Sequence, residues 1–175
     1  MSKLQSILTS SLLLIVFVSC SLQKRFTNPL LPSGADPWSI YKDGYYYYTH
    51  TLGNKLVIWK TKNIAKLKTA ESKTVFQPPP NTMYSKQLWA PEIHFINDAW
   101  YLYFAADDGK NENHRLYVLQ NISEDPMKGE WIFKGKLVDP SDKWAIDGSV
   151  FEHDGQLYLV WSGWEGDKNG QQDIY

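Results

Sequence analysis

The chain has 175 residues, 18 basic and 19 acidic side chains, and a formal net charge of −1. Its basic residues are dispersed and form no stripe of the kind that follows a phosphate backbone, which argues against nucleic acid as a partner. Aromatic residues make up 15% of the sequence, with eight Trp and eleven Tyr. Most of these rings are expected in the strands and core of a β-rich fold.

The first predicted element is an N-terminal leader. An apolar run of twelve residues, from Ile7 to Val18, follows Lys3 and ends at Ser19. This length is typical of a signal peptide and is too short to span a bilayer as a helix, which needs about 20 residues. We therefore expect residues 1–20 to be a signal peptide and the mature protein to be exported.

The leader ends at Cys20, the only cysteine in the chain. A cysteine after a small residue at this place resembles a bacterial lipobox, in which the cysteine is lipidated and becomes the mature N-terminus. Residues 21–27 would then be a tether, the lipid anchor would be the only membrane contact, and the protein would belong to the cell envelope. Phe17 stands where that motif usually has Leu, so cleavage by an ordinary signal peptidase and secretion remain the alternative.

The rest of the chain repeats one pattern three times: a short apolar run, a turn, and a run rich in aromatic and β-branched residues. The turn aspartates are Asp43, Asp98 and Asp154, which lie 55 and 56 residues apart. Each copy is typical of a β-hairpin. A regular period of this length predicts an array of equivalent supersecondary units.

Further strands complete the first two copies. A third strand is predicted at 56–60 and at 115–119, and a fourth at 74–76 and at 131–134. Four antiparallel strands per repeat describe a blade of a β-propeller. No segment after the leader has a helical period, so the predicted fold is nearly all β.

The blades are predicted at about 34–88, about 89–144 and, incomplete, from about 145. Propellers close with roughly 4–8 blades, and about two and a half cannot close a ring. We therefore expect 28–175 to be the N-terminal part of a longer propeller.

Two carboxylates occupy the same place in their repeats. Asp36 opens the first copy and Asp147 opens the third. Since equivalent positions converge on the axis of a propeller, these acids are predicted to face each other across a central pocket. Each alone also fits a simple turn signal, as Asp-Pro or Asp-Gly. Facing acids in an exported, aromatic-rich propeller favour a sugar ligand, because the apolar faces of sugars stack on indole rings.

Three blade openings carry a resemblance to a known family. The segments Gly34–Trp38, Trp89–His94 and Ala145–Phe151 resemble, in order and spacing, those of glycoside hydrolase family 43. The resemblance covers 28–175 and implies a five-bladed propeller that cleaves arabinose- or xylose-containing plant polysaccharides. The run Trp161–Glu165 is most similar to arabinofuranosidase-type members of the family.

The resemblance also implies roles for the two acids. Asp36 would be the general base that activates water, and Asp147 would tune the pKa of the general acid and orient the sugar. Inverting hydrolysis needs a second carboxylic acid roughly 6.5–9.5 Å from the base to protonate the leaving oxygen. In the family this acid is a glutamate at the opening of the fourth blade, beyond Tyr175, so the activity of the 175 residues alone is in doubt.

Four other residues are candidates for sugar contacts. Trp89 would line the sugar-binding subsite, with core packing as the equal alternative, and Ile146 would touch the sugar ring. Trp164 and His50, near the ends of second strands, would lie at the mouth of the pocket, although packing roles are the commoner outcome for such residues. Glu92, aligned with Pro37 and Gly148 of the other copies, is expected to make a structural hydrogen bond to a neighbouring blade.

Cofactors and substrates complete the predictions. His94 and His114 are too scattered to suggest a zinc site, and no cofactor is predicted in this chain. The resemblance allows a structural calcium in the complete fold, with its histidine downstream. Arabinan, arabinoxylan or xylan is the expected substrate. A non-catalytic carbohydrate-binding propeller, or a five-bladed glycosidase acting on fructans or mannosides, remains an alternative.

Overall fold

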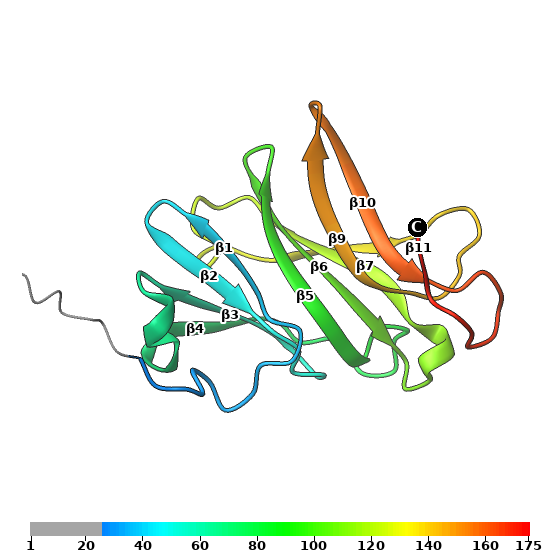
Figure 1. The fold of residues 1–175 in the computed structure, drawn as a ribbon, viewed down its shortest axis with the longest axis horizontal. Coiled ribbons are helices and arrows are strands. Elements are labelled where there is room, and N and C mark those ends of the chain that lie inside the picture. The colour runs from blue at the N-terminus through cyan, green and yellow to red at the C-terminus, as the bar shows by residue number, and fades with distance from the viewer. Residues whose placement is uncertain (1–25) are drawn as a thin grey trace, which may run out of the picture.

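A computed structural model describes residues 26–175, and Figure 1 shows their arrangement as three antiparallel sheets. The predicted signal peptide and Cys20 lie outside the described residues. The strands are β1 (Trp38–Lys42), β2 (Tyr45–Thr49), β3 (Leu56–Thr61), β4 (Glu71–Phe76), β5 (Lys86–Ile96), β6 (Ala99–Asp107), β7 (Arg115–Asn121), β8 (Ile132–Leu137), β9 (Ala145–His153), β10 (Gln156–Gly163) and β11 (Asp173–Ile174). Two short 3-10 helices, η1 (Ile64–Thr69) and η2 (Asn111–Asn113), interrupt them. None of the helices in this part of the chain is long and apolar enough to cross a membrane.

Each sheet is one propeller blade, which confirms the predicted fold class. Strands β1 to β4 pair in chain order in the first sheet, and β5 to β8 do so in the second. The third sheet has β9 and β10, with the two-residue β11 beside β10. In Figure 1 the blades lie side by side, with β5 between the β1–β2 hairpin and the β9–β10 hairpin.

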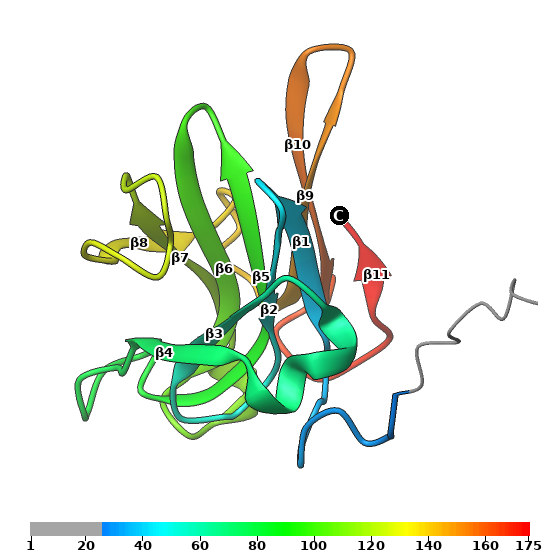
Figure 2. The same cartoon turned by 90° about the vertical axis from the view of Figure 1, so that its left-hand side faces the viewer.

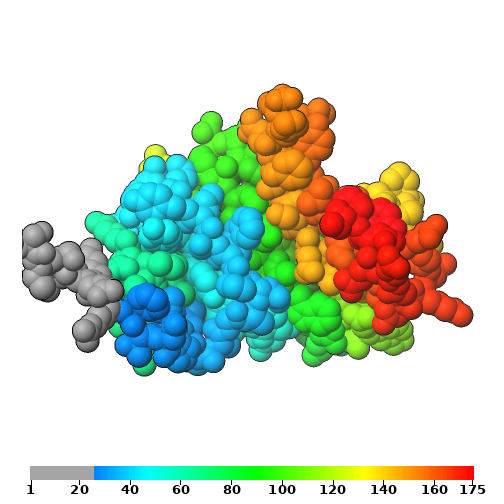
Figure 3. All heavy atoms as spheres, in the orientation of Figure 1, coloured from blue at the N-terminus to red at the C-terminus, as the bar shows by residue number. Residues whose placement is uncertain are grey.

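The β9–β10 hairpin projects beyond the other two blades, as Figure 2 and the space-filling view of Figure 3 show. Its outer part carries exposed apolar side chains, including Phe151, Leu157 and Tyr158. The rings of Phe151 and Tyr158 stack on one another with centroids 5.4 Å apart. Blade 3 therefore leaves an apolar sheet face in solvent, unlike blade 2.

The hairpin turns correct our alignment of the repeats by one residue in blade 2. Left-handed backbone pairs form the turns Asp43–Gly44 and Asp154–Gly155, and the corresponding pair in blade 2 is Asn97–Asp98. Asn97, rather than Asp98, is therefore the equivalent of Asp43. The prediction was wrong because Asn adopts left-handed backbone as Asp does, and an Asp happened to follow it.

Blade 2 is buried on both faces because the side chains of β6 alternate between two clusters. Trp100, Leu102 and Phe104 face the main core between blades 1 and 2. Ala105 faces a second cluster, between blades 2 and 3, which includes Leu116 and Ala145. The small Ala side chain on this face allows β9 to approach blade 2 closely.

Polar contacts join blade 1 to blade 2 across the main core. The Trp38 indole donates to the carbonyl of Ile93 at 2.9 Å. Lys60 on β3 donates to Asp125 in the β7–β8 connection at 2.6 Å, and both side chains are mostly buried. Burial is the largest single influence and opposes ionisation of Asp125, but the hydrogen bond and charge of Lys60, together with the Met127 amide and the charge of Lys128, outweigh it and lower the pKa of this carboxyl. The Lys60–Asp125 ion pair thus links blade 1 to blade 2.

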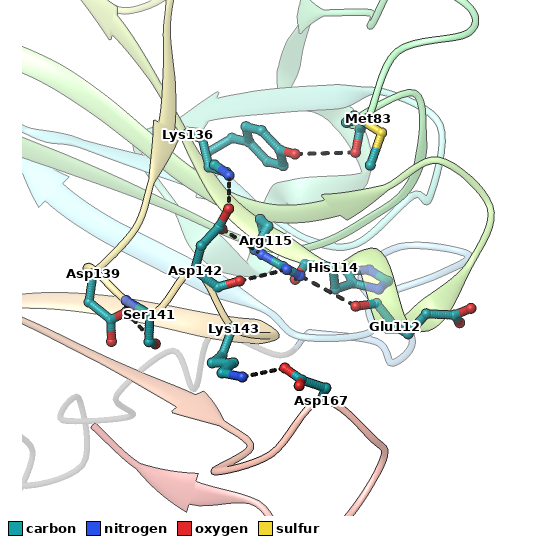
Figure 4. Close-up of polar contacts among 11 residues, drawn as sticks. Met83, Glu112, His114, Arg115, Lys136, Asp139, Ser141, Asp142, Lys143 and Asp167 are labelled. Atoms are coloured by element: carbon teal, nitrogen blue, oxygen red, sulfur yellow. Dashed lines mark hydrogen bonds and ion pairs between the residues drawn. The ribbon is translucent and has the colours of Figure 1, made fainter.

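A second polar network joins blade 2 to the segment that leads into β9 (Figure 4). Arg115 donates to the Asp142 carboxylate at 2.8 Å and to its carbonyl at 2.7 Å, and Lys136 donates to the same carboxylate at 2.6 Å. The hydrogen bond from Lys136, together with Arg115, lowers the pKa of Asp142 against a smaller effect of burial. Lys143 pairs with Asp167 further along. These contacts hold the entry to blade 3 on the edge of blade 2.

We expect the Lys60–Asp125 pair to stabilise the fold measurably. In a double-mutant cycle with Lys60→Met and Asp125→Asn, the interaction energy in the free energy of unfolding should be about 1–3 kcal/mol, as for hydrogen bonds to charged groups. Since the pKa of Asp125 is lowered on folding, this term is present above the unfolded-state value of about 4 and is lost as the pH falls below it.

The control cycle uses Lys42→Met and Asp43→Asn, because that pair is similarly close, at 2.7 Å, but its aspartate is 74% exposed. Its interaction energy should be close to zero. Equal interaction energies for the two pairs would contradict the burial argument.

Candidate active site

Three residues with the same unusual backbone lie before or within the first strands of the three blades. Asp36, Ala90 and Asp147 have φ angles of 51°, 41° and 55°, in the left-handed region that L-residues seldom adopt. Ala90 is therefore the blade 2 equivalent of the two acids. Such residues are concentrated at functional sites, where the surrounding structure enforces them. The predicted equivalence of Asp36 and Asp147 is thus visible in the backbone.

A hydroxyl group ties Asp36 to blade 2. Thr51 Oγ1 donates to Asp36 Oδ2 at 2.6 Å and accepts the Ala90 amide at 2.7 Å. The Thr51 amide also donates to the carbonyl of Ala35 at 2.9 Å. Thr51 follows β2, so the end of a second strand does return to the start of the first strands, as predicted. The result is a continuous link from the blade 1 carboxylate to the backbone beside Trp89.

Trp89 lies between two irregularities of β5. Gln87 also has left-handed backbone, with φ of 48°, and the register with β6 shifts on both sides of Trp89. Bulges of this kind redirect a side chain and are common beside active sites. The half-buried indole stacks on the His114 ring, with centroids 4.1 Å apart, and packs against the second cluster together with Ile146. Trp89 and Ile146, both predicted sugar contacts, therefore pack against the same cluster, which would form one wall of the predicted sugar pocket.

Asp147 is placed by close packing at the next residue. A Cβ at Gly148 would lie 2.8 Å from a Leu116 methyl, so only glycine allows β9 to approach blade 2 here. Asp147 itself is exposed, although protein atoms surround its carboxyl group on several sides. This partial burial raises its pKa, the charges of Asp36 and Glu92 add to the rise, and His114 opposes it. The three carboxylates thus share one electrostatic environment.

Glu92 lies on β5 between the other two acids. Its carboxylate is 3.0 Å from His94 Nε2, and both side chains are mostly buried. The His94 ring is in turn 5.0 Å from the Trp38 ring of blade 1. Glu92 therefore makes a hydrogen bond within its own strand, and the predicted bond to a neighbouring blade is wrong. The one-residue shift in blade 2 also makes Pro91, rather than Glu92, the equivalent of Pro37 and Gly148.

The structure places His50 inside blade 1. It is 1% exposed, its Nε2 is 2.9 Å from Ser33 Oγ, and its ring stacks on Trp59 at 4.8 Å. Burial lowers the pKa of this histidine, which favours the neutral ring. The surroundings favour a packing role, and a sugar contact for His50 remains a prediction.

Trp164 is also buried. It is 3% exposed, and its indole lies parallel to that of Trp144 at 4.1 Å. Both rings line a cavity of about 210 Å³ near Tyr175, away from the Asp36 side of the molecule. Its proposed role as a platform for the sugar chain stays a prediction.

Three further residues position the candidate site: Thr51, which the sequence interpretation missed, and Asp107 and His114, whose pairing it did not predict. Thr51 had no signal beyond its place just after a predicted second strand. Asp107 and His114 are 0% exposed and lie 3.0 Å apart, directly behind Trp89. A single Asp and a single His seven residues apart carry no recognisable motif, because only the fold of β6 and β7 brings them together.

The described residues can also be compared with the ligands that a calcium ion requires. Among 26–175, no group of three His, Cys, Asp or Glu side chains is arranged to hold a metal ion. The acids of the candidate site are separate, with Asp36 held by Thr51 and Glu92 by His94. This donor set does not fit a calcium site, and no step of the chemistry below uses a metal.

Comparison with known proteins agrees with this geometry. Residues 26–175 match the family described as Glycosyl hydrolases family 43, and the chain belongs to this family. The extracellular exo-alpha-(1->5)-L-arabinofuranosidase of Streptomyces avermitilis is 36% identical over 142 residues, covering 78% of this chain and 29% of that enzyme.

Solved structures share the fold. The crystal structure of alpha-L-arabinofuranosidase from Lactobacillus brevis superposes with a TM-score of 0.78 at 34% identity, covering 86% of this chain and 50% of that one. The Bacillus subtilis arabinanase has a TM-score of 0.56 at 21% identity, covering 74% and 47%. The chain therefore spans half or less of the length of these relatives, and its three blades correspond to part of a closed propeller.

We expect substitution of Glu92 to change the titration of Asp147. Glu92→Gln removes one negative charge while retaining an amide that can still bond to His94, so the pKa of Asp147 should fall towards its ordinary value. A carbon-13 NMR titration of the Asp147 carboxyl group measures this. The control Glu152→Gln makes the same charge change on an exposed part of β9 and should leave the pKa of Asp147 where it was. An unchanged value in Glu92→Gln would contradict the proposed charge cluster.

Proposed function

We propose that the complete protein is a glycoside hydrolase that inverts the anomeric centre and removes arabinose from plant polysaccharides, as an α-L-arabinofuranosidase. The observation that carries the proposal is the equivalent left-handed backbone of Asp36, two residues before β1, and Asp147, near the start of β9, with charges that influence one another. The arabinofuranosidase names of the Streptomyces avermitilis and Lactobacillus brevis relatives support arabinose as the sugar.

Asp36 is suited to the role of general base. Thr51 donates to one of its oxygens, Oδ2, which holds the carboxylate in one orientation and keeps it an acceptor. In the proposed reaction Oδ1 takes a proton from a water molecule as the water oxygen attacks the anomeric carbon. The glycosidic bond breaks, and its oxygen leaves with a proton from a carboxylic acid on the opposite side of the sugar ring.

Asp147 is suited to tune that acid and to orient the sugar. A negative carboxylate near the acid raises its pKa by repulsion, so the acid stays protonated at working pH. By family resemblance the acid is a glutamate at the start of a fourth blade, outside the described residues. Trp89 and Ile146 would form the wall on which the pentose ring rests.

Export and anchoring complete the proposal. The two Streptomyces relatives are named extracellular enzymes, which supports an exported protein. We propose that residues 1–20 are the signal peptide and that Cys20 carries a lipid anchor in the cell envelope. Arabinan or arabinoxylan outside the membrane is then the substrate, with xylan as the second choice, and a structural calcium would draw on residues of the complete fold.

A carbohydrate-binding propeller without catalysis is the second candidate. The described residues contain the pocket wall and two carboxylates, whereas the proton donor is proposed from the family alone. Binding of pentose chains without turnover would favour this alternative.

We expect Asp36→Asn in the complete protein to lower kcat on an aryl α-L-arabinofuranoside by roughly 100- to 10,000-fold, the usual contribution of a general base. The amide keeps an acceptor for Thr51, and Asn tolerates left-handed backbone, so binding of arabino-oligosaccharides should change little. The control Asp43→Asn makes the same change at an exposed left-handed turn and should be as active as the unaltered enzyme. Full activity in Asp36→Asn would remove Asp36 from the mechanism, and binding without turnover in all three proteins would favour the non-catalytic alternative.

The sugar is tested by the products released. Incubation with arabinan, arabinoxylan, xylan, a fructan and a mannan should release arabinose faster than xylose, with the first product in the inverted anomeric form by proton NMR. The same panel with Asp36→Asn corrects for contaminating activity. Release of fructose or mannose alone would support another five-bladed glycosidase and overturn the arabinofuranosidase proposal.

A further inference from the structure

Asp107 and His114 form a fully buried ionisable pair directly behind the sugar-pocket wall. Asp107 is the last residue of β6, and His114 lies between η2 and β7. His114 Nδ1 is 3.0 Å from Asp107 Oδ2, and neither side chain is exposed. Burial of two such groups is costly unless their polar atoms are satisfied. The proposed catalytic steps do not use them, so their presence calls for another role.

The hydrogen-bonding partners limit how the pair can be protonated. His114 Nε2 is 3.2 Å from the carbonyl oxygen of Gln87, and Nδ1 is 3.3 Å from that of Asn111 as well as close to Asp107. The carbonyl of Gln87 can only accept, so Nε2 donates to it. Nδ1 lies within ion-pair distance of Asp107 Oδ2, an oxygen that has no hydrogen bond of regular geometry in the described part of the chain. Burial raises the pKa of Asp107, against the opposing effects of the Gly109 amide and His114. The ring is thus held by the bond to Gln87 and by the adjacent Asp107 carboxyl group.

His114 contacts both sides of the proposed pocket, one with its ring and the other with its backbone carbonyl. Its face stacks on Trp89 at 4.1 Å with an angle of 25° between the planes. The carbonyl of His114 accepts the Ala145 amide at 3.3 Å, two residues before Asp147. Its bond to Gln87 also reaches the left-handed residue that precedes Trp89 by two positions. His114 thus meets the strand of Trp89 through its ring and the strand of the second carboxylate through its backbone carbonyl.

We propose that Asp107 and His114 are a positioning pair for the sugar pocket: Asp107 fixes the His114 ring, and the ring sets the tilt of Trp89 beneath the bound pentose. Neither residue touches the reacting atoms. The effect on sugar affinity rests on the proposed function, because it requires Trp89 to contact the sugar. The effect on Trp89 itself does not depend on any activity.

Four variants separate positioning from general stability. His114→Gln removes the ring face that supports Trp89, and Asp107→Leu removes the partner that holds the ring. Asp107→Asn is the conservative variant, because its oxygen can accept from Gly109 as Oδ1 does at 2.8 Å, and its amide can donate to Nδ1 of a neutral His114. His153→Gln is the control, since His153 is exposed on the β9–β10 hairpin.

The first measurement follows the indole N–H signal of Trp89 in proton–nitrogen NMR spectra, assigned by its loss in Trp89→Phe. We expect this signal to move in His114→Gln and in Asp107→Leu, and to stay in place in Asp107→Asn and His153→Gln. An unmoved signal in the first two variants would overturn the proposal. Should either variant fail to fold, cross-relaxation between His114 ring protons and the Trp89 indole in the unaltered protein decides, and its absence would overturn the proposal equally.

The second measurement is steady-state kinetics of the complete protein on an aryl α-L-arabinofuranoside. Loss of an aromatic stacking partner should raise KM about twofold to tenfold in His114→Gln, with a smaller change in kcat. KM should also rise in Asp107→Leu, and in Asp107→Asn it should return to the value of the unaltered enzyme. A moved Trp89 signal with unchanged KM would refute the role in sugar binding. An inactive unaltered enzyme would count against the proposed function, while the NMR result would still decide on the pair.

Discussion

The left-handed backbone shared by Asp36, Ala90 and Asp147 is the constraint on which the site depends. An L-residue in this conformation costs roughly 1–2 kcal/mol, and an aspartate less than most because its side chain can bond locally. The blades offset this cost with contacts at the same points. Thr51 binds both Asp36 and Ala90, and glycine at 148 lets β9 lie against Leu116. Each strand start is thereby held by the blade beside it.

This arrangement explains why the site needs residues from neighbouring blades and cannot be formed by a single blade. Blade 1 supplies Asp36, blade 2 supplies Trp89 and its support, and blade 3 supplies Asp147. The Lys60–Asp125 pair and the Arg115–Asp142 network hold the outer parts of the blades together. A change at either junction alters the angle between blades, and a small angular change there moves groups at the centre where the first strands meet.

Much of the fold could be predicted from the sequence because each copy of the repeat indicates the same order of strands and turns. The hairpins rich in aromatic and β-branched residues and the third and fourth strands of blades 1 and 2 all appear close to where the local pattern predicts them. The one-residue error in blade 2 arose because Asn97 and Asp98 are both good left-handed residues, so the local pattern fits either. Asp36, Asp147 and Trp89 were found by their place in the repeat.

The supporting residues could not be found in this way. Thr51 acts across a blade boundary through two hydrogen bonds that no local pattern encodes. Asp107 and His114 meet only because β6 and β7 are paired and joined through η2. His50 and Trp164 were placed near the pocket from strand direction alone, and strand direction does not tell which face of the blade a side chain takes. The face is determined by which side chains become buried, and burial depends on how the whole sheet packs.

The three carboxylates of the described blades also limit where the proton donor of the reaction can lie. Glu92 is mostly buried and engaged by His94, whose ring contacts Trp38, so it is poorly placed to reach a leaving oxygen. In the proposed mechanism Asp36 acts as an anion that activates water, and Asp147 lies close enough for the two charges to interact. A further carboxylic acid brought to this centre would meet Asp36, Glu92 and Asp147 together, and the repulsion would raise its pKa. A general acid needs a raised pKa to remain protonated near neutral pH, and the carboxylates of blades 1 to 3 would supply the repulsion that raises it.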